Sequence, residues 1–116
     1  MSNSDCLFCK IAAGEIPADV VKEGDDWVAF RDISPQAPTH ILIIPREHIA
    51  TLNDVGDDQA DLVGRLFLAA KQIAADEGIA DDGYRTVLNC NVGAGQSVFH
   101  IHAHVLGGRA MGWPPG

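Results

Sequence analysis

The sequence predicts an α+β domain in which an antiparallel sheet carries helices on one face. Several short, β-branched segments are separated by turn residues, one long segment has helical periodicity, and no regular strand-helix-strand alternation indicates a parallel sheet. The chain has 116 residues, of which 47% are hydrophobic and 21% charged. Residues 1–116 therefore fit a single globular domain with an ordinary hydrophobic core.

Five segments have the composition of strands. The first two are separated by the turn-forming Gly24-Asp25-Asp26 and predict a hairpin, and the third is closed by Pro45. A glycine-bearing segment joins the last two. The predicted strands are Val20–Glu23, Trp27–Arg31, Thr39–Ile44, Tyr84–Asn89 and Val98–Leu106.

One long and one short helix complete the prediction. Asp57–Glu77 is amphipathic, with Leu62 and Leu66 on one line of apolar side chains, and is expected to end at Gly78. Leu7–Ala13 is apolar with little β-branching. The short helix carries Cys6 and Cys9 at its start, and cysteines three residues apart share a side of a helix.

Charge and cysteine content exclude several classes of function. The net charge of −8 argues against a surface that binds DNA or RNA. An odd count of three cysteines without an apolar leader disfavours a disulfide framework and favours a reducing compartment. The apolar run Ile41–Ile44 is far shorter than the roughly 20 residues of a membrane span. We expect a cytoplasmic protein without a membrane partner.

Three of the five histidines lie at alternate positions near the end of the chain. His100, His102 and His104 alternate with apolar residues, so a strand would place the imidazoles on one face, roughly 6.6 Å apart. Rings so placed can converge on a small tetrahedral anion or on a metal ion. The other interpretation is a polar outer face. Just upstream, Ser97 and the backbone of Gly93–Gly95 could hold phosphate oxygens.

At this point the sequence resembles the histidine triad (HIT) family. The segment Gly95–Leu106 is similar to the family signature, in which three histidines alternate with apolar residues. The segments Phe30–His40, Gly107–Arg109 and Trp113–Gly116 also agree in order and spacing, the last being similar to the Hint-like branch of nucleotide-binding proteins. The nucleotidyltransferase branch carries Gln in place of the third histidine, so His104 favours hydrolysis over transfer.

The resemblance implies a hydrolase that cleaves the P–N bond of purine nucleoside monophosphoramidates, and that also acts on related aminoacyl adenylates, through a nucleotidyl-histidine. His102 corresponds to the nucleophile, and a neutral imidazole is a good nucleophile near pH 7. His104 would contact the phosphate and the leaving group, and His40 would support the histidine array. Ser97 and Asn89 would bind phosphate oxygens or assist the departing amine.

The resemblance also implies a nucleotide-binding set with Asp32 as acceptor for the ribose hydroxyls. For the apolar members of this set, ordinary core packing is the alternative, and Asp32 could equally cap the loop that follows it. The implied nucleotide-binding residues are Phe8, Ile11, Phe30, Asp32, Ile33, Asn89, Gly95, Ser97, His102, His104 and Trp113.

Zinc-bearing members of the family use positions that correspond to Cys6, Cys9, His48 and His100. All four residues are present, and Zn²⁺ takes four nitrogen or sulfur ligands in a tetrahedron, so a structural zinc is expected. The alternative is two buried thiols with an orienting His100. Cys90 has no partner in this scheme and is expected to be a small core residue.

The resemblance further implies a homodimer in which two five-stranded sheets join into a ten-stranded sheet. Residues 107–116 would then form a tail near the active site of the dimer. Two other functions remain open: a nucleotide-binding interaction protein whose hydrolysis is incidental, and a dinucleoside polyphosphate hydrolase.

Overall fold

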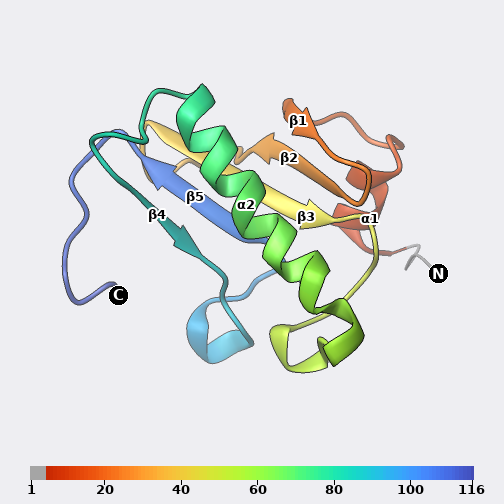
Figure 1. Cartoon of the computed structure of the whole chain (residues 1–116). Helices are drawn as coiled ribbons and strands as arrows, with labels where there is room; N and C mark the ends of the chain where they lie inside the picture. The colour runs from red at the N-terminus through yellow and green to blue at the C-terminus, as the bar shows by residue number, and fades with distance from the viewer. Residues whose placement is uncertain (1–4) are drawn as a thin grey trace.

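A computed structural model describes residues 5–116 and shows a five-stranded antiparallel sheet with one helix on each side (Figure 1). Residues 1–4, which belong to the polar start of the predicted domain, lie outside the described residues. Short 3-10 turns occur at Leu52–Asp54, Asp57–Gln59 and Val92–Ala94. The main elements are α1 Leu7–Ala12, β1 Val20–Glu23, β2 Trp27–Arg31, β3 Thr39–Pro45, α2 Ala60–Asp76, β4 Tyr84–Val87 and β5 Ala103–Gly107.

The strands follow the order β1-β2-β3-β5-β4, and every neighbouring pair is antiparallel. β3 lies at the centre between β2 and β5. Its register places Leu42 opposite His104 and His40 opposite Leu106. His40 and His104 are therefore diagonal neighbours on one face of the sheet, a separation within reach of aromatic side chains.

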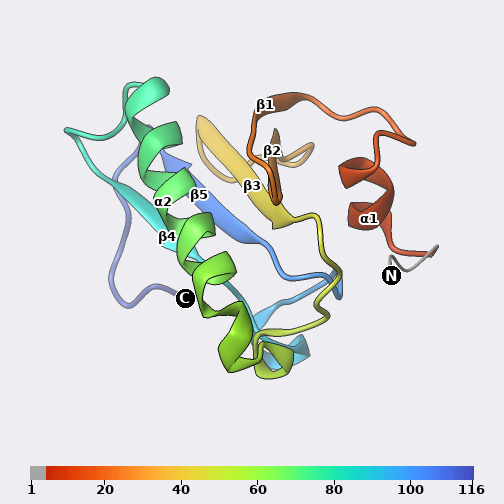
Figure 2. The same cartoon turned by 45° about the vertical axis from the view of Figure 1, so that its right-hand side comes forward.

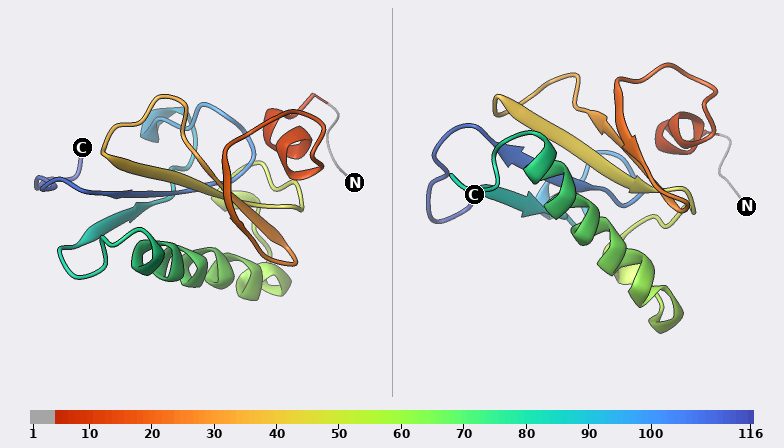
Figure 3. Two further views of the ribbon diagram at one scale, coloured as in Figure 1. Left: turned by 90° about the horizontal axis from the view of Figure 1, so that it is seen from above. Right: turned by 45° about the horizontal axis from the view of Figure 1, so that its top comes forward.

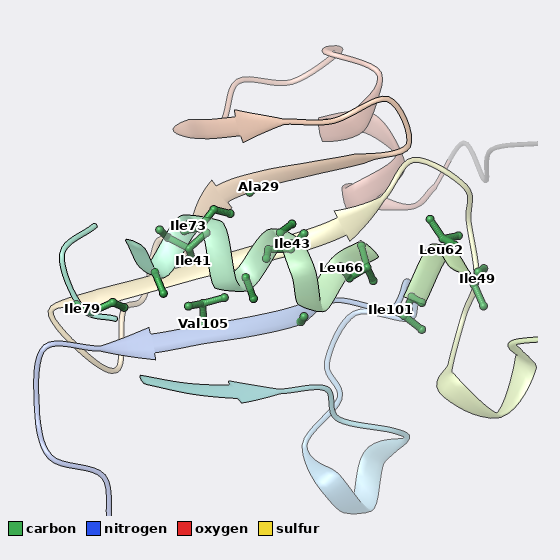
Figure 4. Packing of buried hydrophobic residues seen from close by; sticks show 14 residues of the cluster. Ala29, Ile41, Ile43, Ile49, Leu62, Leu66, Ile73, Ile79, Ile101 and Val105 are labelled. Carbon is green, nitrogen blue, oxygen red and sulfur yellow. The ribbon is translucent and has the colours of Figure 1, made fainter. Parts of the chain in front are cut away.

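α2 covers one face of the sheet and builds the larger core beneath it (Figure 4). The helix ends before Gly78, whose φ of +76° lies in the left-handed region that favours glycine. The predicted inward positions Ile101, Ala103 and Val105 are all fully buried here. The core also contains Ala29, Ile41, Ile43, Ile49, Leu62, Leu66, Ala69, Ala70, Ile73, Ala74 and Ile79.

The prediction that the helices share one face is wrong, because α1 lies on the other side of the sheet from α2 (Figures 2 and 3). The alternate β3 residues Leu42 and Ile44 point away from α2 and pack with Phe8 of α1 and with Phe30. A central strand buried on both faces is a continuous apolar run rather than an alternating one. The run Ile41–Ile44 has this character.

The predicted strand Val98–Leu106 is the main error in element boundaries, because β5 begins only at Ala103. Upstream of it, the Ile101 N–H donates to the carbonyl of Ile49, and the Gln96 amide donates to the carbonyls of Ala50 and Val98. The bonds to Ile49 and Ala50, in the segment after β3, take the place of a sheet ladder. His100 and His102 therefore lie ahead of the strand, and His104 lies within it.

Smaller differences occur at the other boundaries. β4 ends at Val87 rather than Asn89, and α2 begins at Ala60 after a 3-10 turn over Asp57–Gln59. The first two strands are confirmed as predicted, and β3 extends to Pro45, which pairs with Trp27. Among the described residues, the longest helices remain too short or too polar to cross a bilayer.

Candidate active site

A cavity of about 630 Å³ opens on the face of the sheet opposite α2. Its walls come from α1, from β2 and the loop after it, and from the segment before β5. Sequence analysis did not identify Ile16, Pro17 or Leu42, which also line it, because nothing in their spacing separates them from ordinary apolar residues. Eight of the predicted site residues line the cavity: Phe8, Ile11, Phe30, Asp32, Ile33, Ser97, His102 and His104.

Four of the predicted catalytic and nucleotide-binding residues lie outside the cavity lining: His40, Asn89, Gly95 and Trp113. His40 is buried behind His104, and Trp113 is 84% exposed in the tail. The N–H of Gly95 donates to the carbonyl of Val92 within its own turn. Of the predicted phosphate-binding turn, the Ser97 side is therefore the part that faces the cavity.

His102 reaches the cavity as a ring with one nitrogen fixed. Its Nδ1 lies 2.8 Å from the carbonyl oxygen of His100, and a carbonyl can only accept, so Nδ1 carries the proton. Burial lowers the pKa of His102 and keeps the ring neutral near pH 7. The rings of Phe8 and His102 pack in a T-shaped arrangement with their centroids 5.0 Å apart. Nε2 therefore carries the lone pair that a nucleophilic imidazole requires, and within residues 5–116 no hydrogen bond engages it.

His104 and His40 form a hydrogen-bonded pair whose direction follows from a backbone group. The N–H of Gln36 donates to His40 Nδ1 at 3.0 Å, so the His40 proton must lie on Nε2. That Nε2 is 2.9 Å from His104 Nδ1, which therefore accepts. The remaining His104 proton lies on Nε2. The pair thus presents a neutral N–H donor from His104, a residue of the cavity wall.

Burial is the main reason that both rings of this pair are neutral. Burial, together with repulsion from positive charge on the neighbouring His102 and His40, lowers the pKa of His104 to about 4. Burial also lowers the pKa of His40, although the carboxylate of Asp32 acts in the opposite direction. An extra proton on His40 Nδ1 or on His104 Nδ1 would displace a hydrogen bond, because each of these nitrogens already accepts one.

Asp32 serves the loop and the cavity together, so the two interpretations of this residue are compatible. Its Oδ1 accepts from the N–H of Ser34 at 2.8 Å, an Asx turn. Its Oδ2 lies 3.5 Å from His40 Nε2. Asp32, His40 and His104 are close enough together to hold a metal ion. The proton on His40 Nε2 instead makes this group a hydrogen-bonded cluster.

A second cluster brings together the four predicted metal ligands, whose ligand atoms all lie within 4.8 Å of one another. Cys6 Sγ is 3.3 Å and Cys9 Sγ 3.5 Å from His100 Nδ1, and Cys9 Sγ is 3.3 Å from His48 Nδ1. Tetrahedral Zn²⁺ with ordinary bond lengths separates sulfur and nitrogen ligands by about 3.6 Å. The spacing of the donors therefore fits zinc closely.

The protonation of His100 supports the same conclusion. Its ring is fully buried, and Nε2 lies 2.8 Å from the carbonyl oxygen of Pro45, so Nε2 carries the proton and Nδ1 faces the thiols unprotonated. Metal-bound histidines commonly donate their second N–H to a carbonyl in this way. Cys90 belongs to neither buried cluster of the described residues and is partly exposed, so its expected place in the core is wrong.

Comparison with known proteins places this geometry in a family. A model of the HIT domain matches residues 13–111. The chain belongs to the HIT family. It is 54% identical to the purine nucleoside phosphoramidase of Escherichia coli strain K12 over 108 residues, which cover 93% of this chain and 91% of that protein. It is 51% identical to an uncharacterised HIT-like protein of Synechococcus elongatus, over 98% of this chain and 99% of the relative.

Solved structures of HIT proteins share the fold closely. A HIT family hydrolase from Legionella pneumophila superposes with a TM-score of 0.95 at 61% identity, over 97% of this chain and 100% of that one. A histidine triad protein from Clostridium difficile gives a TM-score of 0.94 at 41% identity and covers 97% of each chain. The five-stranded antiparallel sheet with one long helix is thus a HIT fold.

In this HIT domain the three histidines divide between two environments. His100 turns toward the cysteines, whereas His102 and His104 line the cavity. The convergence of all three rings on one ligand, which the alternating pattern permits, therefore does not occur.

Proposed function

We propose that this HIT protein is a purine nucleoside phosphoramidase, which hydrolyses the P–N bond of nucleoside monophosphoramidates and the P–O bond to the acyl group in related aminoacyl adenylates. The observation that carries the proposal is the state of His102: a neutral ring at the cavity whose Nδ1–H is held by the His100 carbonyl and whose Nε2 is free. The E. coli relative, which bears this activity in its name, supports it at 54% identity.

The cavity offers complementary surfaces to the two halves of such a substrate. The aromatic and aliphatic side chains of Phe8, Ile11 and Phe30 form an apolar region for the base. Asp32 supplies a carboxylate for the ribose hydroxyls, with Ile33 beside it. The α-phosphate would lie between Ser97 and His102, and Asn89 and Gly95 would act from just outside the cavity lining.

Catalysis then proceeds in two displacements. In the first, His102 Nε2 bonds to the α-phosphorus as the P–N bond breaks, and the departing nitrogen takes one proton from solvent to leave as the amine. His104 Nε2–H donates a hydrogen bond to the departing nitrogen or to a phosphoryl oxygen, where charge develops. In the second displacement, water attacks phosphorus and the bond between His102 Nε2 and phosphorus breaks. One proton of the water returns to solvent, and His102 is restored.

A structural zinc held by Cys6, Cys9, His48 and His100 forms part of the proposal. When bound, the ion supplies cross-linking rather than chemistry, because its four protein ligands leave no open position. The ligands come from the start of α1, the segment after β3 and the segment before β5. The site would therefore fasten α1, which carries Phe8, to the segment that carries His102.

We also propose a cytoplasmic homodimer with a ten-stranded sheet. β4 lies at one edge of the sheet, where a second copy could continue the ladder. Of the predicted tail 107–116, Gly107 ends β5 and residues 108–116 continue beyond the sheet (Figure 1). Trp113 in this tail is a large, exposed aromatic side chain of the kind that is buried at interfaces. In the dimer this tail, Trp113 included, would lie near the active site.

The decisive experiment is mass spectrometry of the intact protein mixed with an adenosine 5′-phosphoramidate. We expect an adenylylated species during turnover and release of AMP, and neither with His102→Ala. His48→Ala, which removes a different histidine and leaves the nucleophile, is expected to retain the adduct. Binding of the nucleotide by the intact protein without turnover would contradict the enzyme and indicate a nucleotide-binding interaction protein.

A further inference from the structure

The state of His104 depends on a loop outside the cavity. His104 donates from Nε2 because its Nδ1 accepts from His40, and His40 donates because its own Nδ1 accepts from the N–H of Gln36. If the His40 proton moved to Nδ1, it would face the Gln36 N–H, and two donors would point at each other. His40 Nε2 would then be an acceptor, so the favoured position of the His104 proton would be Nδ1. His104 would then face the substrate with a lone pair. One backbone N–H thus selects the working tautomer of both rings.

Gln36 lies in an exposed loop between two prolines, and most of its described hydrogen bonds are local. The N–H of Ser34 donates to Asp32, and the Gln36 amide donates to the carbonyl of Ser34. Arg109 reaches the loop from the turn that follows β5, and its Nε donates to the carbonyl oxygen of Gln36 at 3.0 Å. The carbonyl of Gln36 therefore accepts from Arg109, and the N–H of Gln36 donates to His40.

The turn that carries Arg109 is itself packed tightly against this loop. Gly108 has a φ of +90°, and a Cβ at this position would lie 2.9 Å from Cβ of Pro38. The turn therefore needs glycine both for its backbone conformation and for the close approach of Pro38. This contact fixes the distance between β5 and the loop, so that the Arg109 side chain spans a defined gap.

We propose that Arg109 is a positioning residue that selects the donating tautomer of His104, acting through Gln36 and His40. The role rests on the proposed phosphoramidase reaction, in which His104 donates to the departing nitrogen. Arg109 does not line the cavity, and its own bonds go to the carbonyls of Gln36 and Ala110. Its contribution is to keep the Gln36 N–H directed at His40.

The chain offers a matched control in Arg85. Arg85 also donates to a backbone carbonyl across the end of the sheet, that of Gly112, but this carbonyl belongs to the tail and not to the loop. Arg85→Met removes an anchor of the tail and leaves the contact with Gln36. Arg109→Met removes the contact with Gln36, and Arg109→Lys keeps the charge and a donor.

The first measurement is the ring ¹⁵N NMR spectrum of His40 and His104, which does not depend on any activity. We expect both rings to be protonated at Nε2 in the wild type and in Arg85→Met, and a mixture of tautomers in Arg109→Met that Arg109→Lys partly reverses. Unchanged tautomers in Arg109→Met would overturn the proposal, whatever the enzyme does.

The second measurement compares two leaving groups, an alkylamine and a nitrophenolate, on adenosine monophosphate. A lost transition-state donor costs about 10²–10³ in kcat, so a partial loss in Arg109→Met is expected to lower kcat about tenfold for the basic amine, with KM unchanged. The nitrophenolate should be nearly unaffected. Equal losses for both leaving groups would overturn the proposal. Absence of turnover in the wild type would contradict the phosphoramidase reaction and leave the tautomer result standing.

Discussion

His100 and His104 lie two residues to either side of His102 and yet belong to different kinds of site. At His100 the backbone carbonyl of Pro45 takes the Nε2 proton, so the ring turns Nδ1 toward two thiols in a fully buried setting. At His104 the His40 ring occupies Nδ1, so Nε2 is left for the cavity. The position of a histidine in the triad thus matters less than which of its ring nitrogens a neighbour occupies.

The two sites should also contribute to different properties. The cluster of Cys6, Cys9, His48 and His100 joins segments that are distant in the chain, so its loss should mainly lower the free energy of unfolding. The cavity site presents a donor to a reacting group, so its loss should appear mainly in kcat. Three experiments test this division.

Metal removal should have the largest effect, and it should act on stability. A ligand present at 1,000 times its Kd stabilises the folded state by about 4 kcal/mol. We expect a chelator, or Cys9→Ala, to lower the free energy of unfolding toward that extent, measured by thermal unfolding together with the metal content. Cys90→Ala is the matched control, since Cys90 lies outside the cluster. Equal zinc content in Cys9→Ala and the wild type would argue against this site.

His104→Ala should have the next largest effect, and it should act on kcat. Removal of a donor to the developing charge costs about 10²-fold in kcat or more, whereas circular dichroism should show a folded protein. His104→Gln is the control: an amide can accept from His40 and donate from its NH₂ group. We expect His104→Gln to retain much more activity than His104→Ala. Equal losses in the two variants would show that donation from this position is not what matters.

The smallest expected effect is a dependence of stability on pH. Burial holds the pKa of His104 at about 4, below its ordinary value of 6.5, so the unfolded chain binds a proton that the folded protein excludes. Above pH 6.5 this group does not change the free energy of unfolding with pH. As the pH falls from 6.5 to about 4, the free energy of unfolding decreases, because only the unfolded chain takes up the proton. The difference in Tm between pH 7 and pH 4.5 should be smaller in His104→Gln than in the wild type. Identical pH profiles would contradict the buried neutral state.

Sequence reasoning located the site better than it described it. The alternation of His102 and His104 with apolar residues predicted their shared face, and Cys6, Cys9 and His48 were placed with His100 by the family resemblance. The structure brings each of these two sets of side chains together, and what each set binds stays a prediction. The extent of β5 was wrong because hydrogen bonds from Gln96 and Ile101 to the loop after β3 are contacts distant in sequence.

The direction of the hydrogen bonds was also beyond the sequence. Nothing in the residues around Gln36 shows that its N–H meets His40 Nδ1, because that bond depends on how a loop with two prolines folds back over β3. The placement of α1 was missed for a related reason. The apolar run Ile41–Ile44 shows that both faces of β3 are buried, but it does not show which helix covers which face.

The buried alternation of Ile101, Ala103 and Val105 beneath α2 has a consequence for how this chain can change in length. An insertion or deletion of one residue between His100 and Gly107 would exchange the two faces of the segment, burying imidazoles under the helix and turning aliphatic side chains toward the cavity. Such a change would remove the core and the chemistry together. We expect this stretch to accept substitutions far more readily than changes of length, whereas the exposed turn at Asp81 and Asp82 can lengthen without disturbing either face.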